Sequence, residues 1–147
     1  MKYQCTIDID LPIAETAELW QNEDHFGKWQ DGFKSIEVIE GKANTEGAKS
    51  RILFDGKRKM ELIETIIESN LPTEKTALYE HIHMTNTQTT RFEVIDVNKT
   101  RYISEVEYLK FNGLLIKLIA KLFPSKFKEQ SQKWMQQFKE FAESHNS

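Results

Sequence analysis

The sequence is poor in the residues that cross-link a chain or cradle phosphate. It has one cysteine, Cys5, in 147 residues, which excludes an intramolecular disulfide and a zinc site built on a cysteine cluster. Its six glycines are too widely spaced to form the glycine-rich loop of a nucleotide-binding protein. The chain is therefore expected to rely on a hydrophobic core, and its length is sufficient to bury one.

An excess of one charge and long apolar runs are also lacking. There are 20 Lys and Arg residues against 23 Asp and Glu residues, a net charge of −3, so no nucleic-acid partner is expected. The longest apolar stretch, residues 114–123, contains two lysines and is too short to span a bilayer. Residues 1–12 lack the continuous apolar core of a signal peptide, and we therefore expect a cytoplasmic location.

The sequence does contain apolar alternation with a period of two, which is the pattern of a half-buried strand. Residues 2–11 alternate without a break, with Tyr3, Cys5 and Ile7 on the apolar side. The same criterion predicts further strands over residues 33–40, 49–54, 58–68, 76–84, 89–97 and 101–110. Short turns such as Asp55-Gly56 join them, which favours an antiparallel arrangement.

Helical patterns lie after the first strand and at the C-terminal end. Pro12 can begin a first helix. That helix ends within the stretch WQNEDHFGKWQDGF (residues 20–33), where Gly27 and Gly32 indicate a broken helix or two short helices with a tight connection. From Gly113 the pattern is helical almost to the end, and Pro124 should kink or split that helix. The order predicts one α+β domain over residues 1–147, with an antiparallel sheet of about seven strands covered by the long helix.

The face of the sheet opposite the charged side chains combines apolar and polar residues. Alternation turns the following residues inward: Phe54, Leu62, Glu64, Tyr79, His81, His83, Phe92, Tyr102 and Ser104. A closed core seldom contains so many polar groups, because each one needs a hydrogen-bond partner. An internal hydrogen-bond network is one explanation, but we favour a cavity that holds water or a ligand.

The order of short motifs along the chain is that of a known superfamily. The segment TIDIDLPIAETAELWQNEDHFGKWQDGFKSIEVIEG contains a strand ending in Pro12, a short helix, a bend with Asp24, then Trp29 and a second strand. Later, Thr100-Arg101-Tyr102 and Asn112-Gly113-Leu114-Leu115 precede the terminal helix. In this order the motifs resemble the START-like, or SRPBCC, superfamily, which includes polyketide cyclase/dehydrase-like and birch-pollen-allergen-type proteins. The resemblance covers nearly the whole chain.

This resemblance implies a helix-grip fold, in which a curved sheet wraps around the C-terminal helix with an internal hydrophobic cavity between them. Members bind lipids, sterols, polyketides or plant hormones, and some are cyclases or hydrolases. We therefore predict binding, extending to transport, of a hydrophobic small molecule such as a lipid, polyketide or isoprenoid, with no cofactor and no metal. The predicted cavity residues are Trp29 and Phe33 at the rim, and Phe54, Leu62, Glu64, Tyr79, His81, His83, Phe92, Tyr102, Ser104, Phe127, Ser131, Trp134, Met135 and Phe138.

An enzymatic alternative uses polar residues of the same cavity. His81 and His83 would face one side of a single strand, with Glu64 on its neighbour. With Tyr79, these residues could supply the acid-base groups of a cyclase or dehydratase, although ligand orientation without chemistry is preferred. The two histidines and Glu64 could also hold a metal as a two-histidine, one-carboxylate set, but hydrogen bonding within the cavity wall is favoured.

Residues 114–128 offer a third alternative. They are both apolar and cationic, a combination that suits transient contact with an acidic membrane or with a partner. The preferred interpretation is a helix whose apolar face packs on the sheet while its lysines are solvated. Nothing in the sequence specifies an oligomeric state.

Overall fold

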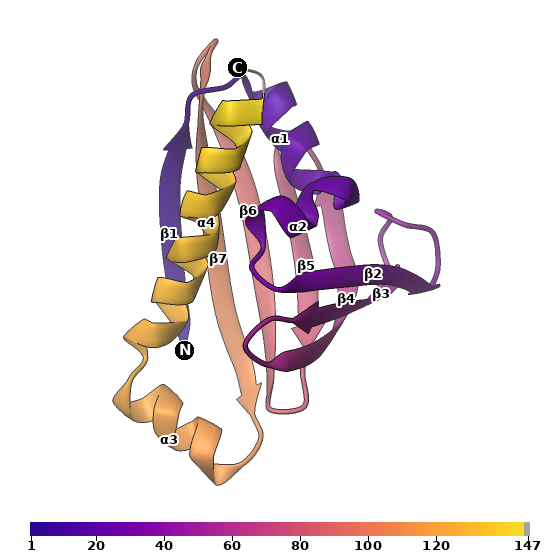
Figure 1. Cartoon of the computed structure of the whole chain (residues 1–147), viewed down its shortest axis with the longest axis vertical. Helices are drawn as coiled ribbons and strands as arrows, with labels where there is room; N and C mark the ends of the chain where they lie inside the picture. Colours follow the sequence, from indigo (N-terminus) through magenta and orange to yellow (C-terminus); the bar gives the residue numbers. More distant parts are fainter. Residues whose placement is uncertain (146–147) are drawn as a thin grey trace.

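Seven strands form one antiparallel sheet in the computed structural model, which describes residues 1–145 (Figure 1). The strands are β1 (Lys2–Ile9), β2 (Phe33–Glu40), β3 (Lys49–Asp55), β4 (Lys59–Asn70), β5 (Glu74–Glu80), β6 (Met84–Asp96) and β7 (Lys99–Phe111). Their order across the sheet is β1-β7-β6-β5-β4-β3-β2. Strands β2 to β7 thus form a meander and β1 pairs with β7, so the predicted α+β class and strand number are confirmed.

The helices also follow the predicted order. They are α1 (Ile13–Gln21), a 3₁₀ turn η1 (Glu23–His25), α2 (Phe26–Trp29), α3 (Leu114–Leu122) and α4 (Ser125–His145). Pro124 separates α3 from α4, because proline lacks the N–H that would continue the first helix. Helix α4 runs along the concave side of the sheet, chiefly beside β1, with α1 and α2 next to it (Figure 1). Among residues 1–145, no helix has the length and apolar character needed to cross a membrane.

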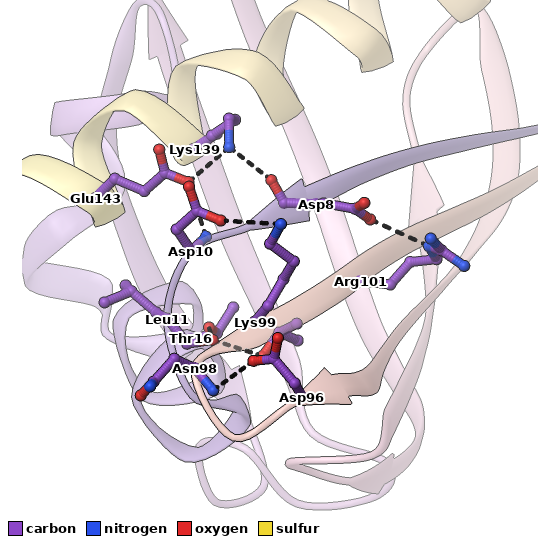
Figure 2. Close-up of polar contacts among 11 residues, drawn as sticks. Asp8, Asp10, Leu11, Thr16, Asp96, Asn98, Lys99, Arg101, Lys139 and Glu143 are labelled. Carbon is purple, nitrogen blue, oxygen red and sulfur yellow. Dashed lines mark hydrogen bonds and ion pairs between the residues drawn. The ribbon is translucent and has the colours of Figure 1, made fainter.

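A set of polar contacts fixes the C-terminal half of α4 to the end of β1 (Figure 2). The Lys139 ammonium donates to the backbone carbonyl of Asp8 at 2.7 Å and lies 2.6 Å from the Glu143 carboxylate. The same carboxylate accepts from the backbone N–H of Asp10 at 2.8 Å. The Asp8 side chain in turn accepts from Arg101 of β7 at 3.1 Å. Helix α4 is therefore bound at this end to β1, which Arg101 in turn links to β7.

A closed hydrophobic core fills the space beneath that half of α4. Phe138 is fully buried, and its ring lies 5.2 Å from that of Trp29 and 5.6 Å from that of Tyr102. The Trp20 indole N–H donates to the Tyr102 hydroxyl at 3.0 Å, which satisfies both buried polar atoms. Trp29 retains only 6% of its exposure, so the prediction that it lies at a cavity rim is wrong. It packs in the core because α2 turns it toward α4.

The hairpin between β5 and β6 differs from the predicted one. The strand expected over residues 76–84 ends at Glu80, and His81, Ile82 and His83 form the turn. His81 and Met84 exchange backbone hydrogen bonds of 2.9 and 3.3 Å, which closes this turn tightly. The threonine-rich start of β6 forms strand rather than loop, since β-branched residues fit a pleated surface. Both histidines therefore leave the inner face on which alternation placed them.

The bend after α2 rests directly on the β3–β4 turn. Gly32 has a φ of +78°, and a Cβ at this position would lie 3.0 Å from the backbone N and Cα of Gly56. The backbone N–H of Asp55 also donates to the Gly32 carbonyl at 2.7 Å. Only glycine satisfies both the left-handed backbone and the close approach.

The substitution Gly32→Ala is expected to lower the free energy of unfolding by about 2–5 kcal/mol. It adds the left-handed backbone cost of about 1–2 kcal/mol to an overlap of about 1–3 kcal/mol. Gly47→Ala is the matched control, because Gly47 has a φ of +82° but open space around its Cβ position. Urea denaturation of both variants separates the two terms, and equal losses would contradict the steric contribution at Gly32.

Candidate ligand-binding site

Three charged or polar side chains meet on the concave face of the sheet. Glu64 of β4 and Tyr79 of β5 are direct cross-strand partners, and the Tyr79 hydroxyl donates to the Glu64 carboxylate at 2.7 Å. The Lys75 ammonium lies 3.9 Å from the same carboxylate. Side chains of Lys75 and Glu64 are only 11% and 9% exposed, so the pair is largely removed from water. We call these three residues the polar triad.

The surroundings of the polar triad set its protonation and charge. Burial, together with the adjacent Glu64 carboxylate, raises the pKa of Tyr79 well above its usual value. The Tyr79 hydroxyl therefore stays protonated and remains a donor. Lys75 also lies 5.5 Å from the centre of the Trp20 ring, close enough for a cation–π contact. The triad thus presents a carboxylate, an ammonium and a phenol within one small region.

Sequence reasoning found two members of the triad and missed the third. Glu64 and Tyr79 were predicted on the inner face, and the structure places them there in contact. Lys75 shares that face because it precedes Tyr79 by four residues on β5, with buried Ala77 between them. The predicted strand begins at residue 76, so Lys75 falls outside it, whereas β5 begins at Glu74. Lysine is also rarely buried, so its residue type gives no reason to extend the strand.

An aromatic wall lies farther along the same face of the sheet, because Phe54 pairs with Met60 whereas Glu64 pairs with Ser50. The Trp134 indole from α4 stacks on Phe54 of β3, with ring centres 5.7 Å apart and planes inclined by 12°. Phe33 of β2 meets Phe54 edge-on at 6.0 Å. The Trp134 Nε1–H is buried and has no hydrogen-bond partner within residues 1–145. It is a buried donor without a partner in the described part of the chain, and it lies among apolar side chains.

The middle strands of the concave face are incompletely covered. Four side chains point inward by register and yet keep part of their surface exposed: Leu62, Tyr79, Asn86 and Gln88. Helix α4 makes its main contacts with β1, α1 and α2 instead of with β4 to β6. In the part of the concave face nearest α1, in contrast, the Phe92 side chain is only 2% exposed. The concave face therefore combines a closed core at one end with accessible apolar and polar surface over β4 to β6.

The remaining predicted cavity residues fall into other parts of the molecule. Phe92, Tyr102, Ser104, Met135 and Phe138 lie in the closed core with Trp29, each of them buried. Phe127 and Ser131 lie near the start of α4, where the Tyr3 hydroxyl contacts the Ser131 hydroxyl at 2.7 Å and donates to the Phe127 carbonyl at 3.1 Å. Of the predicted residues, Phe33, Phe54 and Trp134 form the aromatic wall, and Leu62, Glu64 and Tyr79 lie on the same face of β4 and β5.

The two histidines face each other in the β5–β6 turn. Their ring centres are 5.4 Å apart, and the backbone N–H of His83 donates to Nδ1 of His81 at 3.2 Å. Burial and the neighbouring His83 lower the pKa of His81. Glu64 is engaged with Tyr79 and Lys75, so the two-histidine, one-carboxylate set is not assembled. Within residues 1–145 no group of three or more potential ligands could hold a metal ion.

Comparison with known proteins identifies the fold of the chain. No family model matches the chain, and no curated protein matches its sequence. The crystal structure of Zhui aromatase/cyclase from a Streptomyces species aligns with a TM-score of 0.81 at 9% identity, over 100% of this chain and 96% of that one. The fold is the helix-grip fold.

Two further helix-grip structures align equally completely. The protein TTHA0849 from Thermus thermophilus gives a TM-score of 0.78 at 16% identity, over 100% of both chains. Ara h 8.0201 gives 0.73 at 14% identity, over 97% of both chains. The resemblance to the START-like superfamily that the motifs indicated is thereby confirmed at the level of the fold. Because fold does not determine chemistry, function has to be argued from the site.

Proposed function

We propose that this protein binds a hydrophobic small molecule, such as a lipid, polyketide or isoprenoid, against the concave face over β4 to β6. The observation that carries the proposal is the partly exposed inner surface, where the Phe54–Trp134 wall and the polar triad share one face of the sheet. Ligand sites are mainly apolar with a few oriented polar groups, and this surface has that composition. A cytoplasmic location and a role in transport belong to the same proposal.

The polar groups of the site restrict which functional groups the bound molecule carries. Glu64 can accept a hydrogen bond, while Lys75 and the unpaired Trp134 N–H can donate one. A ligand with an apolar body and a hydroxyl or carbonyl group would use both kinds of partner. The apolar body would supply most of the affinity, at about 25 cal/mol for each Å² buried. The polar group would fix its orientation.

Titration with the fluorescent apolar probe N-phenyl-naphthylamine tests this proposal. Trp134→Ala is expected to weaken binding at least about tenfold, because it removes one of the two stacked rings and the free donor. Glu107→Ala, an exposed residue on the outer side of β7, should leave the affinity unchanged. Equal affinities for the two variants, or no binding to the unaltered protein, would reject the site. Mass spectrometry of organic extracts then identifies the natural ligand.

The enzymatic alternative is supported by one contact, the Tyr79–Glu64 hydrogen bond. In a cyclase or dehydratase, Glu64 would remove a proton from the substrate. The Tyr79 hydroxyl would then turn from Glu64 to the substrate and donate its one hydrogen bond to the developing enolate. His81 and His83 lie in the turn rather than beside this pair. Glu64→Gln and Tyr79→Phe would each abolish turnover of a candidate substrate if the pair is catalytic, while His81→Gln would leave it intact.

A further inference from the structure

Helix α3 exposes the apolar side that a packed helix would bury. Four of its leucines are largely exposed: Leu114 at 88%, Leu115 at 73%, Leu118 at 52% and Leu122 at 57%. At about 100° per residue, these four fall within an arc of about 100° on one side of the helix. Ile116, Ile119 and Ala120, on the other side, are half-buried. The prediction that the apolar face packs on the sheet is therefore wrong for these leucines, which we call the leucine face.

The leucine face lies at one extremity of the molecule. Figure 1 shows α3 beyond the end of β7, beside the start of α4 and away from the body of the sheet. The β5–β6 turn lies at the same end, since Asn112 donates to the backbone carbonyls of His83 at 2.8 Å and Ile82 at 3.4 Å. Ile82 is itself 76% exposed. Exposed apolar side chains from two separate segments thus lie at this end of the fold.

The charge of the same segment is opposite to that of the protein. Residues 108–128 contain five lysines and no acidic residue, whereas the whole chain has a net charge of −3. Lys117 and Lys121 are exposed on α3 beside the leucine face. Lys126 lies 5.5 Å from the centre of the Phe123 ring, which is itself 52% exposed. Within residues 108–128, the exposed apolar side chains are therefore accompanied by lysines and by no acidic residue.

We propose that α3 docks on an anionic lipid surface, with the leucine face in the interfacial region and the lysines among the headgroups. An exposed apolar helix face flanked by lysines has the composition of an interfacial helix. A second copy of this chain fits the face less well, because a two-fold contact would bring Lys117 and Lys121 of both copies together. This docking function is separate from ligand binding on the concave face and does not depend on it.

Co-sedimentation with phosphatidylcholine vesicles, with and without phosphatidylglycerol, tests the docking function. The protein should bind only the anionic vesicles, more weakly at high salt. The double variant Leu115→Ser with Leu118→Ser should lower the partition coefficient at least about tenfold, because it removes two apolar side chains from the interface. The control is Val97→Ser, since Val97 is 80% exposed in the β6–β7 turn at the opposite end of the sheet. It should bind as the unaltered protein does.

A charge-reversal pair tests the lysines separately. Lys117→Glu with Lys121→Glu should abolish binding to anionic vesicles. Lys57→Glu with Arg58→Glu changes the net charge equally in the exposed β3–β4 turn and should have little effect. Failure to bind anionic vesicles at low salt would overturn the proposal. So would equal losses in the two charge-reversal variants, or a stable dimer that the double leucine variant dissociates.

Discussion

Replacing Phe138 by alanine is expected to lower the free energy of unfolding by about 3–5 kcal/mol. The Phe138 side chain is fully buried in α4 and touches both Trp29 and Tyr102. Its loss removes apolar burial and leaves a cavity beneath α4. The surrounding rings cannot collapse into that space, because α2 holds Trp29 and the hydrogen bond from Trp20 holds Tyr102.

Chemical denaturation monitored by circular dichroism measures this loss. Phe123→Ala is the matched control, because the same side chain is about half exposed between α3 and α4. Its effect should stay within about 0.5 kcal/mol, as is usual for surface positions. A small loss at Phe138 would mean that α4 contributes little to the core and that the core lies within the sheet and α1.

The second large effect is expected at the polar triad. Lys75→Met should cost about 3 kcal/mol, because it leaves the largely buried Glu64 carboxylate without its cation. Adding Glu64→Gln should recover much of that loss. Glutamine keeps an acceptor for the Tyr79 hydroxyl and has no charge to compensate.

A double-mutant cycle makes this prediction quantitative. The two single variants and the double variant should give an interaction energy of at least about 1 kcal/mol. Additive losses would show that the two charges do not stabilise each other across the 3.9 Å that separates them. The control pair is Arg51 and Glu61, in contact at 3.0 Å on the exposed side of the sheet, where the interaction energy should be below about 1 kcal/mol.

Local patterns were enough to predict the order of elements. Strict alternation predicted β1, and the Asp55-Gly56 dipeptide predicted the β3–β4 turn. Pro124 predicted the break between α3 and α4. Each of these signals acts within a few residues, so no long-range information was needed. The same alternation correctly turned Glu64 and Tyr79 toward the interior.

Features that depend on long-range packing were not predictable in this way. The turn at His81–His83 contains no glycine, proline or asparagine, so nothing local distinguishes it from strand. The periodicity of α3 predicts an apolar side but does not say what that side faces. Lys75 and Trp29 are buried because distant segments cover them: Glu64 and Trp20 for the lysine, and Phe138 for the tryptophan.

The pairing of β1 with β7 has a consequence for biogenesis. Lys2 pairs with Glu107 and Ile9 with Thr100, and the Lys139 ammonium of α4 then binds the Asp8 carbonyl. Closing so long a loop carries an entropic cost that hairpins within the meander avoid. During synthesis, therefore, β1 leaves the ribosome before β7 and stays unpaired until β7 follows. Its exposure to proteases and chaperones ends only when the C-terminal helix arrives.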